Sequence, residues 1–193
     1  MERDTEEFNS VTTHINGSWT LKSFLKGDSD LMESVYETGN MDFEFDNEMV
    51  NITYIAKKAY VADKMFEWKK EYPDLKVDSY KVVQTGNWHV DKKGEAIFFD
   101  EIKTDLIITG SGSNFESFYA WEKSKVEMTK GAAESGGLLG KVLAQSVTGT
   151  KDLFPEISEA MGYWINLDSN TSILNLRKGK NEGAFDVKLS KQN

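Results

Sequence analysis

The stretch that decides the fold of this chain is MDFEFDNEMVNITY, residues 41–54. Its first half alternates apolar and acidic side chains up to the polar turn Asp46-Asn47-Glu48. After the turn, Val50, Ile52 and Tyr54 alternate with polar residues. A period of two places alternate side chains on opposite faces of a strand, so the pattern predicts a β-hairpin with one apolar face.

Strand signals continue on both sides of this hairpin. They fall at residues 17–25, 80–90, 97–99, 106–108, 115–128, 163–167, 173–177 and 185–189, and short polar turns join most of them. Neighbouring strands joined by short turns pair antiparallel, because parallel pairing needs a long crossover. We therefore expect an all-β fold, an antiparallel meander of nine or ten strands. Such a meander packs as a sandwich or closes into an eight- to ten-stranded barrel, and closure removes the exposed sheet edges.

Two interruptions have the spacing of helices. Residues 57–72 place Val61, Met65, Trp68 and Tyr72 on one face, and the following proline ends the pattern. Residues 137–148 carry apolar side chains at helical spacing behind a pair of glycines. Either insertion could cover a barrel mouth as a lid or pack on the outer wall. Residues 1–14 are polar and predict a flexible lead-in, which leaves residues 15–193 as a single domain.

Composition excludes several classes of protein. The chain has 193 residues, 23 basic against 32 acidic, and a net charge of −9. Such a surface repels nucleic acid and acidic membranes, since phosphate binding needs clustered Lys and Arg. The absence of cysteine excludes disulfides, thiolate catalysis and cysteine-ligated metals. No apolar run reaches the roughly 20 residues of a membrane span, so we expect membrane association only through a lipid anchor outside this chain.

A Gly-x-Trp unit occurs three times, at Gly17-Ser18-Trp19, Gly86-Asn87-Trp88 and Gly162-Tyr163-Trp164. The second and third units each lead through a turn into another apolar strand, so we interpret them as a recurring hairpin device. The glycine is expected to let the large indole pack against neighbouring backbone. A tryptophan in such a strand is expected to belong to the core.

An N-terminal Gly-x-Trp strand that opens an antiparallel meander resembles the lipocalin superfamily. The turns after the repeated units are similar to those in the lipocalin-like domains of bacterial secreted lipoproteins. The resemblance implies a calycin-type barrel whose closed end holds Trp19 beneath a late-strand arginine, here Arg177, in a cation–π contact of about 1 kcal/mol. It also implies an extracytoplasmic location, periplasmic or anchored to the outer membrane. The middle lipocalin motif Thr-Asp-Tyr is matched only in part, by Thr104-Asp105-Leu106, which favours the looser bacterial group.

Catalytic chemistry finds little support in the sequence. The two histidines, His14 and His89, are not spaced as metal ligands, and His89 is expected to face solvent because its neighbour Trp88 faces inward. No Gly-x-Ser-x-Gly elbow marks a nucleophilic serine. We therefore predict no catalytic residue, no metal, no cofactor and no enzymatic activity.

The sequence thus predicts a non-catalytic, exported, lipocalin-like domain that binds a small apolar ligand. Aromatic side chains predicted to line the barrel are Phe43, Phe45, Tyr54, Tyr80, Phe99, Tyr119 and Trp121. The alternative is a structural or protein-interaction module whose barrel is filled by its own side chains. The ligand and the oligomeric state stay open at this point.

Overall fold

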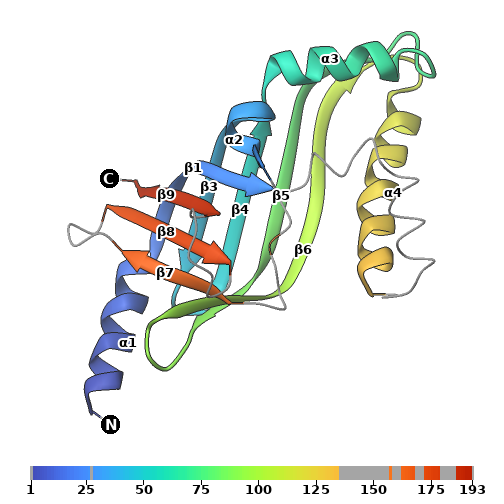
Figure 1. Ribbon diagram of the computed structural model, residues 1–193. Helices are drawn as coiled ribbons and strands as arrows, with labels where there is room; N and C mark the ends of the chain where they lie inside the picture. Colours follow the sequence, from blue (N-terminus) through green and yellow to red (C-terminus); the bar gives the residue numbers. More distant parts are fainter. Residues whose placement is uncertain are drawn as a thin grey trace.

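The computed structural model describes residues 2–26, 28–134, 157, 162–167, 172–178 and 186–192. Its centre is an antiparallel sheet of nine strands in the order β2-β1-β3-β4-β5-β6-β7-β8-β9, in which β1 also pairs with β9. This last pairing closes eight strands into a barrel and leaves β2 outside it (Figure 1). The predicted meander and its closure are confirmed, and the sandwich alternative is wrong.

The strands and helices follow one another along the chain with short connections in the first two thirds. The strands are β1 (Gly17–Lys26), β2 (Ser29–Asp30), β3 (Tyr36–Glu44), β4 (Met49–Ala56), β5 (Lys76–Val90), β6 (Ala96–Ser111), β7 (Tyr163–Leu167), β8 (Ile173–Lys178) and β9 (Val187–Lys191). The helices are α1 (Glu2–Ile15), α2 (Leu31–Ser34), α3 (Lys58–Trp68) and α4 (Phe115–Glu134).

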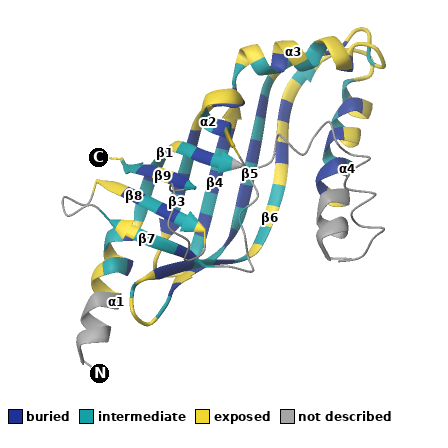
Figure 2. Ribbon diagram, viewed as in Figure 1, coloured by how far each residue is buried: buried dark blue, intermediate teal, exposed yellow. Residues whose placement is uncertain are grey.

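The hairpin expected at residues 41–54 is formed by β3 and β4. Phe43 lies opposite Val50 across it, and Glu48 completes its turn with a positive φ of 53°. The Asn47 side chain accepts a hydrogen bond from the Met49 amide at 3.1 Å, which holds the turn closed. Buried residues alternate along these strands, as along most of the barrel (Figure 2), because one face of each strand points into the barrel.

The next hairpin, β5 and β6, is longer than the sequence indicates. The segments predicted at 97–99 and 106–108 are parts of one 16-residue strand. Among the described residues, β7 pairs with β6 only at Ala96 and Ile97. The two long strands continue past this contact toward α3 (Figure 1). The edge of β6 that faces away from β5 therefore has no strand partner among the described residues along most of its length.

Two predictions of secondary structure are wrong. Residues 115–128, expected as a strand, belong to α4, whose buried residues Phe118, Glu122 and Val126 recur every four positions. This is the spacing of a helix face. Residues 2–15, expected as a flexible lead-in, form α1, which ends in the fully buried Ile15. The helix expected within 57–72 is confirmed as α3, whereas the one expected at 137–148 lies outside the described residues.

The glycines of the Gly-x-Trp units serve different purposes. Gly17 joins α1 to β1 with a φ of +113°, which residues with a side chain rarely adopt. Gly86 lies at a register shift in the β5–β6 ladder, where a Cβ atom would come within 2.7 Å of the Asp100 carbonyl oxygen. The hairpins after the second and third units are confirmed, but the glycines do not act as one shared device.

Candidate functional site in the barrel interior beneath α3

The end of the barrel next to α1 is closed around Trp19. This indole is fully buried, and its Nε1 donates a hydrogen bond of 2.7 Å to the Ile15 carbonyl at the end of α1. The Lys191 ammonium lies 5.3 Å from the centre of the Trp19 ring and donates to the His14 carbonyl at 2.8 Å. The cation over Trp19 therefore comes from β9. Arg177 is on β8, opposite Trp164 of β7. Stacking of Arg177 on Trp19 stays a prediction.

Aromatic rings fill the interior above this closed end. The Phe43 ring lies 5.1 Å from Trp88 and 6.3 Å from Phe99, and Phe99 lies 5.7 Å from Tyr163 in an edge-on contact. Phe43 is paired with Gly17, the first residue of β1 and two residues past the end of α1, which places the group at the α1 end. Contacts of this kind, within about 7 Å and mostly edge-on or tilted, are those of a packed core.

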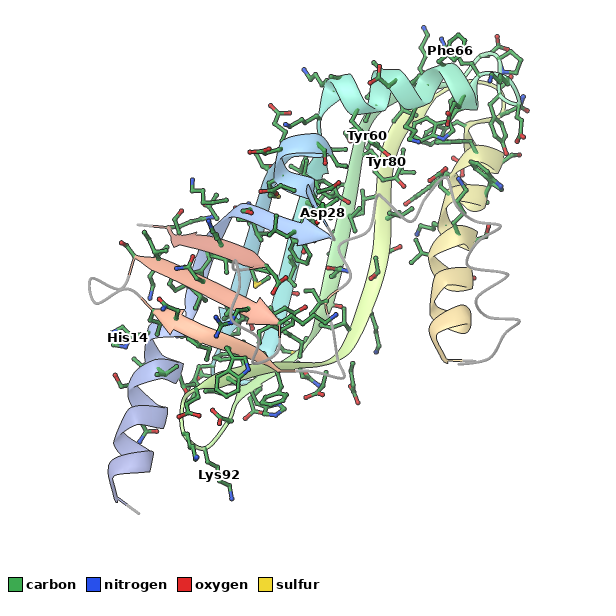
Figure 3. The ribbon with its side chains drawn as sticks, in the orientation of Figure 1. His14, Asp28, Tyr60, Phe66, Tyr80 and Lys92 are labelled. Carbon is green, nitrogen blue, oxygen red and sulfur yellow. The ribbon has the colours of Figure 1, made fainter. Side chains whose placement is uncertain are left out.

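A second group of aromatic side chains occupies the other half of the barrel, toward α3. Tyr36 at the start of β3, Tyr54 near the end of β4 and Tyr80 on β5 are all at most 1% exposed. We call these three residues the tyrosine cluster. The rings of Tyr36 and Tyr54 lie 5.1 Å apart. Tyr60 descends from α3 toward Tyr80 (Figure 3), close enough to influence its ionisation.

The hydroxyls of the tyrosine cluster differ in their partners. The Tyr80 hydroxyl donates a hydrogen bond of 2.9 Å to a carboxylate oxygen of Glu122. The hydroxyls of Tyr36 and Tyr54 are buried and have no hydrogen-bond partner among the described residues. Burial raises the pKa of all three phenols well above the usual value, and the nearby Glu122 carboxylate adds to the rise at Tyr80. The cluster therefore holds its phenol protons throughout the neutral range.

The partner of Tyr80 belongs to a buried charged pair on α4. Glu122 is completely buried, and its other oxygen accepts a bond of 2.6 Å from the Lys125 ammonium, which also lies 3.1 Å from the centre of the Trp121 ring. Burial lowers the pKa of Lys125, and the Glu122 carboxylate opposes that change. A buried carboxylate needs such compensation, because an unpaired charge in the interior is strongly unfavourable.

Helix α4 attaches to the part of β6 that β7 does not cover. The Tyr119 hydroxyl donates a hydrogen bond of 2.8 Å to the Leu106 carbonyl of β6, and Lys123 forms an ion pair of 3.2 Å with Asp105. Sheet edges leave backbone carbonyls without ladder partners, and a covering helix is one way to satisfy them. Helix α4 thus gives this edge of β6 one hydrogen-bond donor and one ion pair.

Rings from α3 and α4 cover Tyr80, one member of the tyrosine cluster. Trp68 of α3 stacks on Tyr80 at 6.1 Å and lies 5.0 Å from Phe118 of α4. Tyr72, just after α3, contacts Phe118 at 5.6 Å and Trp121 at 6.2 Å. The interior at this end is therefore enclosed by two helices. In contrast to the α1 end, its walls carry hydroxyls and a charged pair as well as rings.

The residues predicted to line the barrel fall into two sets. Four of them are buried inside it, namely Phe43, Tyr54, Tyr80 and Phe99. Phe45 is 50% exposed, because β3 ends one residue earlier and Phe45 begins the turn. Tyr119 and Trp121 lie on α4, with Trp121 37% exposed, so the prediction that these three line the barrel wall is wrong. Whether any of the seven contacts a ligand stays a prediction.

Several residues of this site were not found from the sequence. Tyr36 is the first residue of β3, where the sequence shows no clear alternation of apolar and polar residues. Tyr60 is on α3, next to Val61 of the apolar face predicted for that helix. Glu122 and Lys125 were hidden by the wrong strand assignment. The helical spacing of Phe118, Glu122 and Val126 was the signal that could have revealed them.

Metal-binding and solvent-facing groups complete the description. Within the described ranges, no three His, Asp or Glu side chains gather as a metal site requires. His89 is exposed as predicted, stacks on Phe98 and lies 3.1 Å from the Asp100 carboxylate. No helix in the described part of the chain is long and apolar enough to cross a membrane.

Comparison with known proteins gives no family assignment. No protein-family model matches the chain, and no curated protein and no solved structure is significantly similar to it.

Proposed function

We propose that this protein binds a small molecule inside its barrel, between α3 and the inner faces of β3, β4 and β5. The observation that carries the proposal is the pair of buried hydroxyls at Tyr36 and Tyr54 without partners among the described residues. A buried polar group without a hydrogen bond costs about 1–3 kcal/mol. Phenylalanine would fill the same space without that cost. Two adjacent hydroxyls of this kind are best explained by a bound molecule that supplies the missing partner.

The architecture is compatible with this role. Barrels of eight strands have an interior that is either filled by side chains or holds one small ligand. Because an aromatic group packs the α1 end, we assign the proposed site to the α3 end. Ala56 lies directly opposite Tyr36 in the β3–β4 ladder and is buried, so a small side chain is the cross-strand neighbour of this tyrosine.

The proposed role is binding without catalysis. The buried carboxylate of Glu122 already accepts hydrogen bonds from Lys125 and Tyr80 on its two oxygens. These two bonds fix the orientation of the carboxylate, whereas a general base must reach the proton that it removes. Glu122 therefore serves better as a fixed wall of the site than as a reacting group.

A scaffold with a filled barrel is the second candidate. It is favoured by the tight ring contacts among Phe43, Trp88 and Phe99, which show that half of the interior is packed by the protein itself. In a scaffold the same packing would extend through the α3 end, and no small molecule would enter.

Binding of N-phenyl-1-naphthylamine, a neutral apolar dye whose fluorescence rises in apolar surroundings, separates the two candidates. We expect saturable binding by the native protein at one dye per chain. The variant Ala56→Leu enlarges a side chain next to Tyr36 inside the barrel and should weaken binding by about tenfold or more, or 1.4 kcal/mol. The matched control Ala62→Leu adds the same atoms at an exposed position of α3 and should leave binding unchanged.

Two results would support the scaffold instead. One is the absence of saturable dye binding by the native protein. The other is equal binding by the native protein and by an Ala56→Leu variant whose circular dichroism is native. As a measurement independent of the variants, dye bound to the folded barrel must raise the unfolding temperature of the native protein.

Export to an extracytoplasmic location is a separate part of the proposal and rests on the resemblance to lipocalin-like domains of secreted lipoproteins. The reading frame that encodes the chain provides its test. A secretion signal with a lipidation cysteine upstream of residue 1, together with recovery in the membrane fraction, would support a lipid-anchored protein. Recovery of the native protein in the cytosolic fraction would refute export.

A further inference from the structure

We infer that the ligand of the barrel is an apolar molecule carrying a carbonyl or carboxylate oxygen, which accepts hydrogen bonds from the hydroxyls of Tyr36 and Tyr54. This inference rests on the proposed function and adds the chemistry of the group that is recognised. It depends on which polar groups of the interior are already hydrogen-bonded within the protein. It also depends on whether the two remaining hydroxyls act as donors or as acceptors.

The charged groups nearby, Glu122 and Lys125, interact with each other and with neighbouring side chains. Glu122 accepts from Tyr80 at 2.9 Å and from Lys125 at 2.6 Å, and Lys125 also lies over the Trp121 ring. The pair carries one negative and one positive charge, so it exerts little net attraction on a charged ligand. Specificity at the α3 end therefore depends on Tyr36 and Tyr54, whose hydroxyls have no protein partner among the described residues.

These two hydroxyls lie on neighbouring strands and face the same interior. Their rings are 5.1 Å apart and inclined by 39°, so the two side chains run beside one another from β3 and β4. Tyr54 is further fixed by an edge-on contact with Phe24 at 6.3 Å. Packed rings of this kind hold their hydroxyls in place, and a site held in place in advance loses less entropy when a ligand binds.

The chemistry of a phenol makes both groups donors. The lone pairs of a phenol oxygen are partly delocalised into the ring, whereas its proton is more acidic than that of an aliphatic alcohol. Burial raises the pKa of both hydroxyls, which keeps these protons in place. Two donors on rings 5.1 Å apart match an sp² oxygen, because such an oxygen has two lone pairs available. Carbonyl and carboxylate oxygens share this property.

The body of the ligand is expected to be apolar. Phe24, Ile52 and Val82 are buried around the two tyrosines, and Val82 is the direct partner of Tyr54 in the β4–β5 ladder. Apolar walls with a small number of placed polar groups are typical of small-molecule sites. A strongly hydrated ligand such as a sugar would leave most of its own hydroxyls unpaired in these surroundings.

Three dyes with naphthalene bodies test the inference. N-phenyl-1-naphthylamine has no oxygen, 1-anilinonaphthalene-8-sulfonate adds an anionic oxygen acceptor to the same body, and 6-propionyl-2-dimethylaminonaphthalene carries a neutral carbonyl. The variant Tyr36→Phe/Tyr54→Phe removes both donors while keeping both rings. We expect this double variant to weaken the binding of at least one of the two oxygen-bearing dyes by about tenfold or more. The dye without oxygen should change by less than about twofold.

The control variant is Tyr119→Phe, which removes a phenol hydroxyl that α4 donates to the Leu106 carbonyl and should leave all three affinities unchanged. Weakening of the sulfonate dye alone identifies an anionic acceptor such as a carboxylate, and weakening of the ketone dye alone identifies a carbonyl. The carbonyl dye has a second readout, because its emission shifts to the blue when a hydrogen bond to its oxygen is lost. That shift should accompany weaker binding.

Failure of this inference differs from failure of the proposed function. If all three dyes bind in the barrel and the double variant affects them equally, the two hydroxyls do not select an oxygen acceptor and the inference is wrong. If none of the dyes binds, or if Ala56→Leu leaves their binding unchanged, the proposed function itself is wrong. The double variant is expected to fold, since it removes only hydroxyls without partners among the described residues.

Discussion

Two substitutions that each remove one phenol hydroxyl should change stability in opposite directions. The Tyr80 hydroxyl donates to Glu122 at 2.9 Å, whereas the Tyr54 hydroxyl has no hydrogen-bond partner among the described residues. Both side chains are at most 1% exposed, so Tyr80→Phe and Tyr54→Phe delete the same atom from equally buried positions. The two variants therefore differ mainly in whether the deleted hydroxyl had a hydrogen-bond partner.

The expected magnitudes follow from these contacts. A hydrogen bond to a charged group contributes about 1.5–3 kcal/mol, and Tyr80→Phe also leaves a carboxylate oxygen of the fully buried Glu122 without that donor. We expect this variant to lower the free energy of unfolding by about 2–3 kcal/mol. Tyr54→Phe removes a desolvated hydroxyl and no bond, so it should leave stability unchanged or raise it by about 1 kcal/mol.

Urea unfolding followed by tryptophan fluorescence measures this difference, since the chain has five tryptophans. With a slope of about 2–3 kcal/mol per molar urea, the midpoints of the two variants should differ by about 1 M, with unchanged slopes. If Tyr54→Phe destabilises the ligand-free protein as much as Tyr80→Phe does, the Tyr54 hydroxyl has a permanent partner. That result would refute the reasoning behind the proposed site.

The remaining predictions concern pH, the buried charged pair and the closed end of the barrel. The phenols of the tyrosine cluster have pKa values raised above the unfolded value of 10.0, so the folded protein holds more protons above pH 10 and its free energy of unfolding should fall as the pH rises past that point. Tyrosinate absorbance should then show the tyrosine cluster ionising together with unfolding. Lys125→Met leaves the Glu122 carboxylate buried without its cation and should cost about 3–5 kcal/mol in urea unfolding, whereas the double variant Glu122→Leu/Lys125→Met should recover most of that loss. Double-mutant cycles between Trp19→Leu and either Lys191→Met or Arg177→Met should give a coupling of about 0.5–1 kcal/mol for the lysine, and a larger coupling for the arginine would place the cation of β8 over the indole instead.

The part of the fold that the sequence predicted is the part governed by local alternation. Residues 41–54 form their hairpin because a polar turn separates two apolar faces of the right period, and neither feature depends on distant contacts. The inward positions of Phe43, Tyr54, Tyr80 and Phe99 follow from the same rule. The pairing of β1 with β9, however, joins strands at opposite ends of the chain, so closure could be expected only from the instability of exposed edges.

The candidate site depends on a segment whose sequence is compatible with both a strand and a helix. In Phe115–Glu122, alternation selects Phe115, Tyr119 and Trp121 as a strand face, yet the same segment includes a helical face through Phe118 and Glu122. Tertiary structure decides between them, because β7 leaves most of β6 uncovered and a helix can satisfy that edge through the Tyr119 hydroxyl. In a strand with that inward face, Glu122 would point to solvent as an ordinary surface carboxylate. In the helix Glu122 points to Tyr80 and accepts the hydrogen bond of its hydroxyl. In the proposed site, the hydroxyls of Tyr36 and Tyr54 are then the ones that contact the ligand. The binding chemistry proposed for this barrel therefore depends on α4 as well as on the strands of the meander.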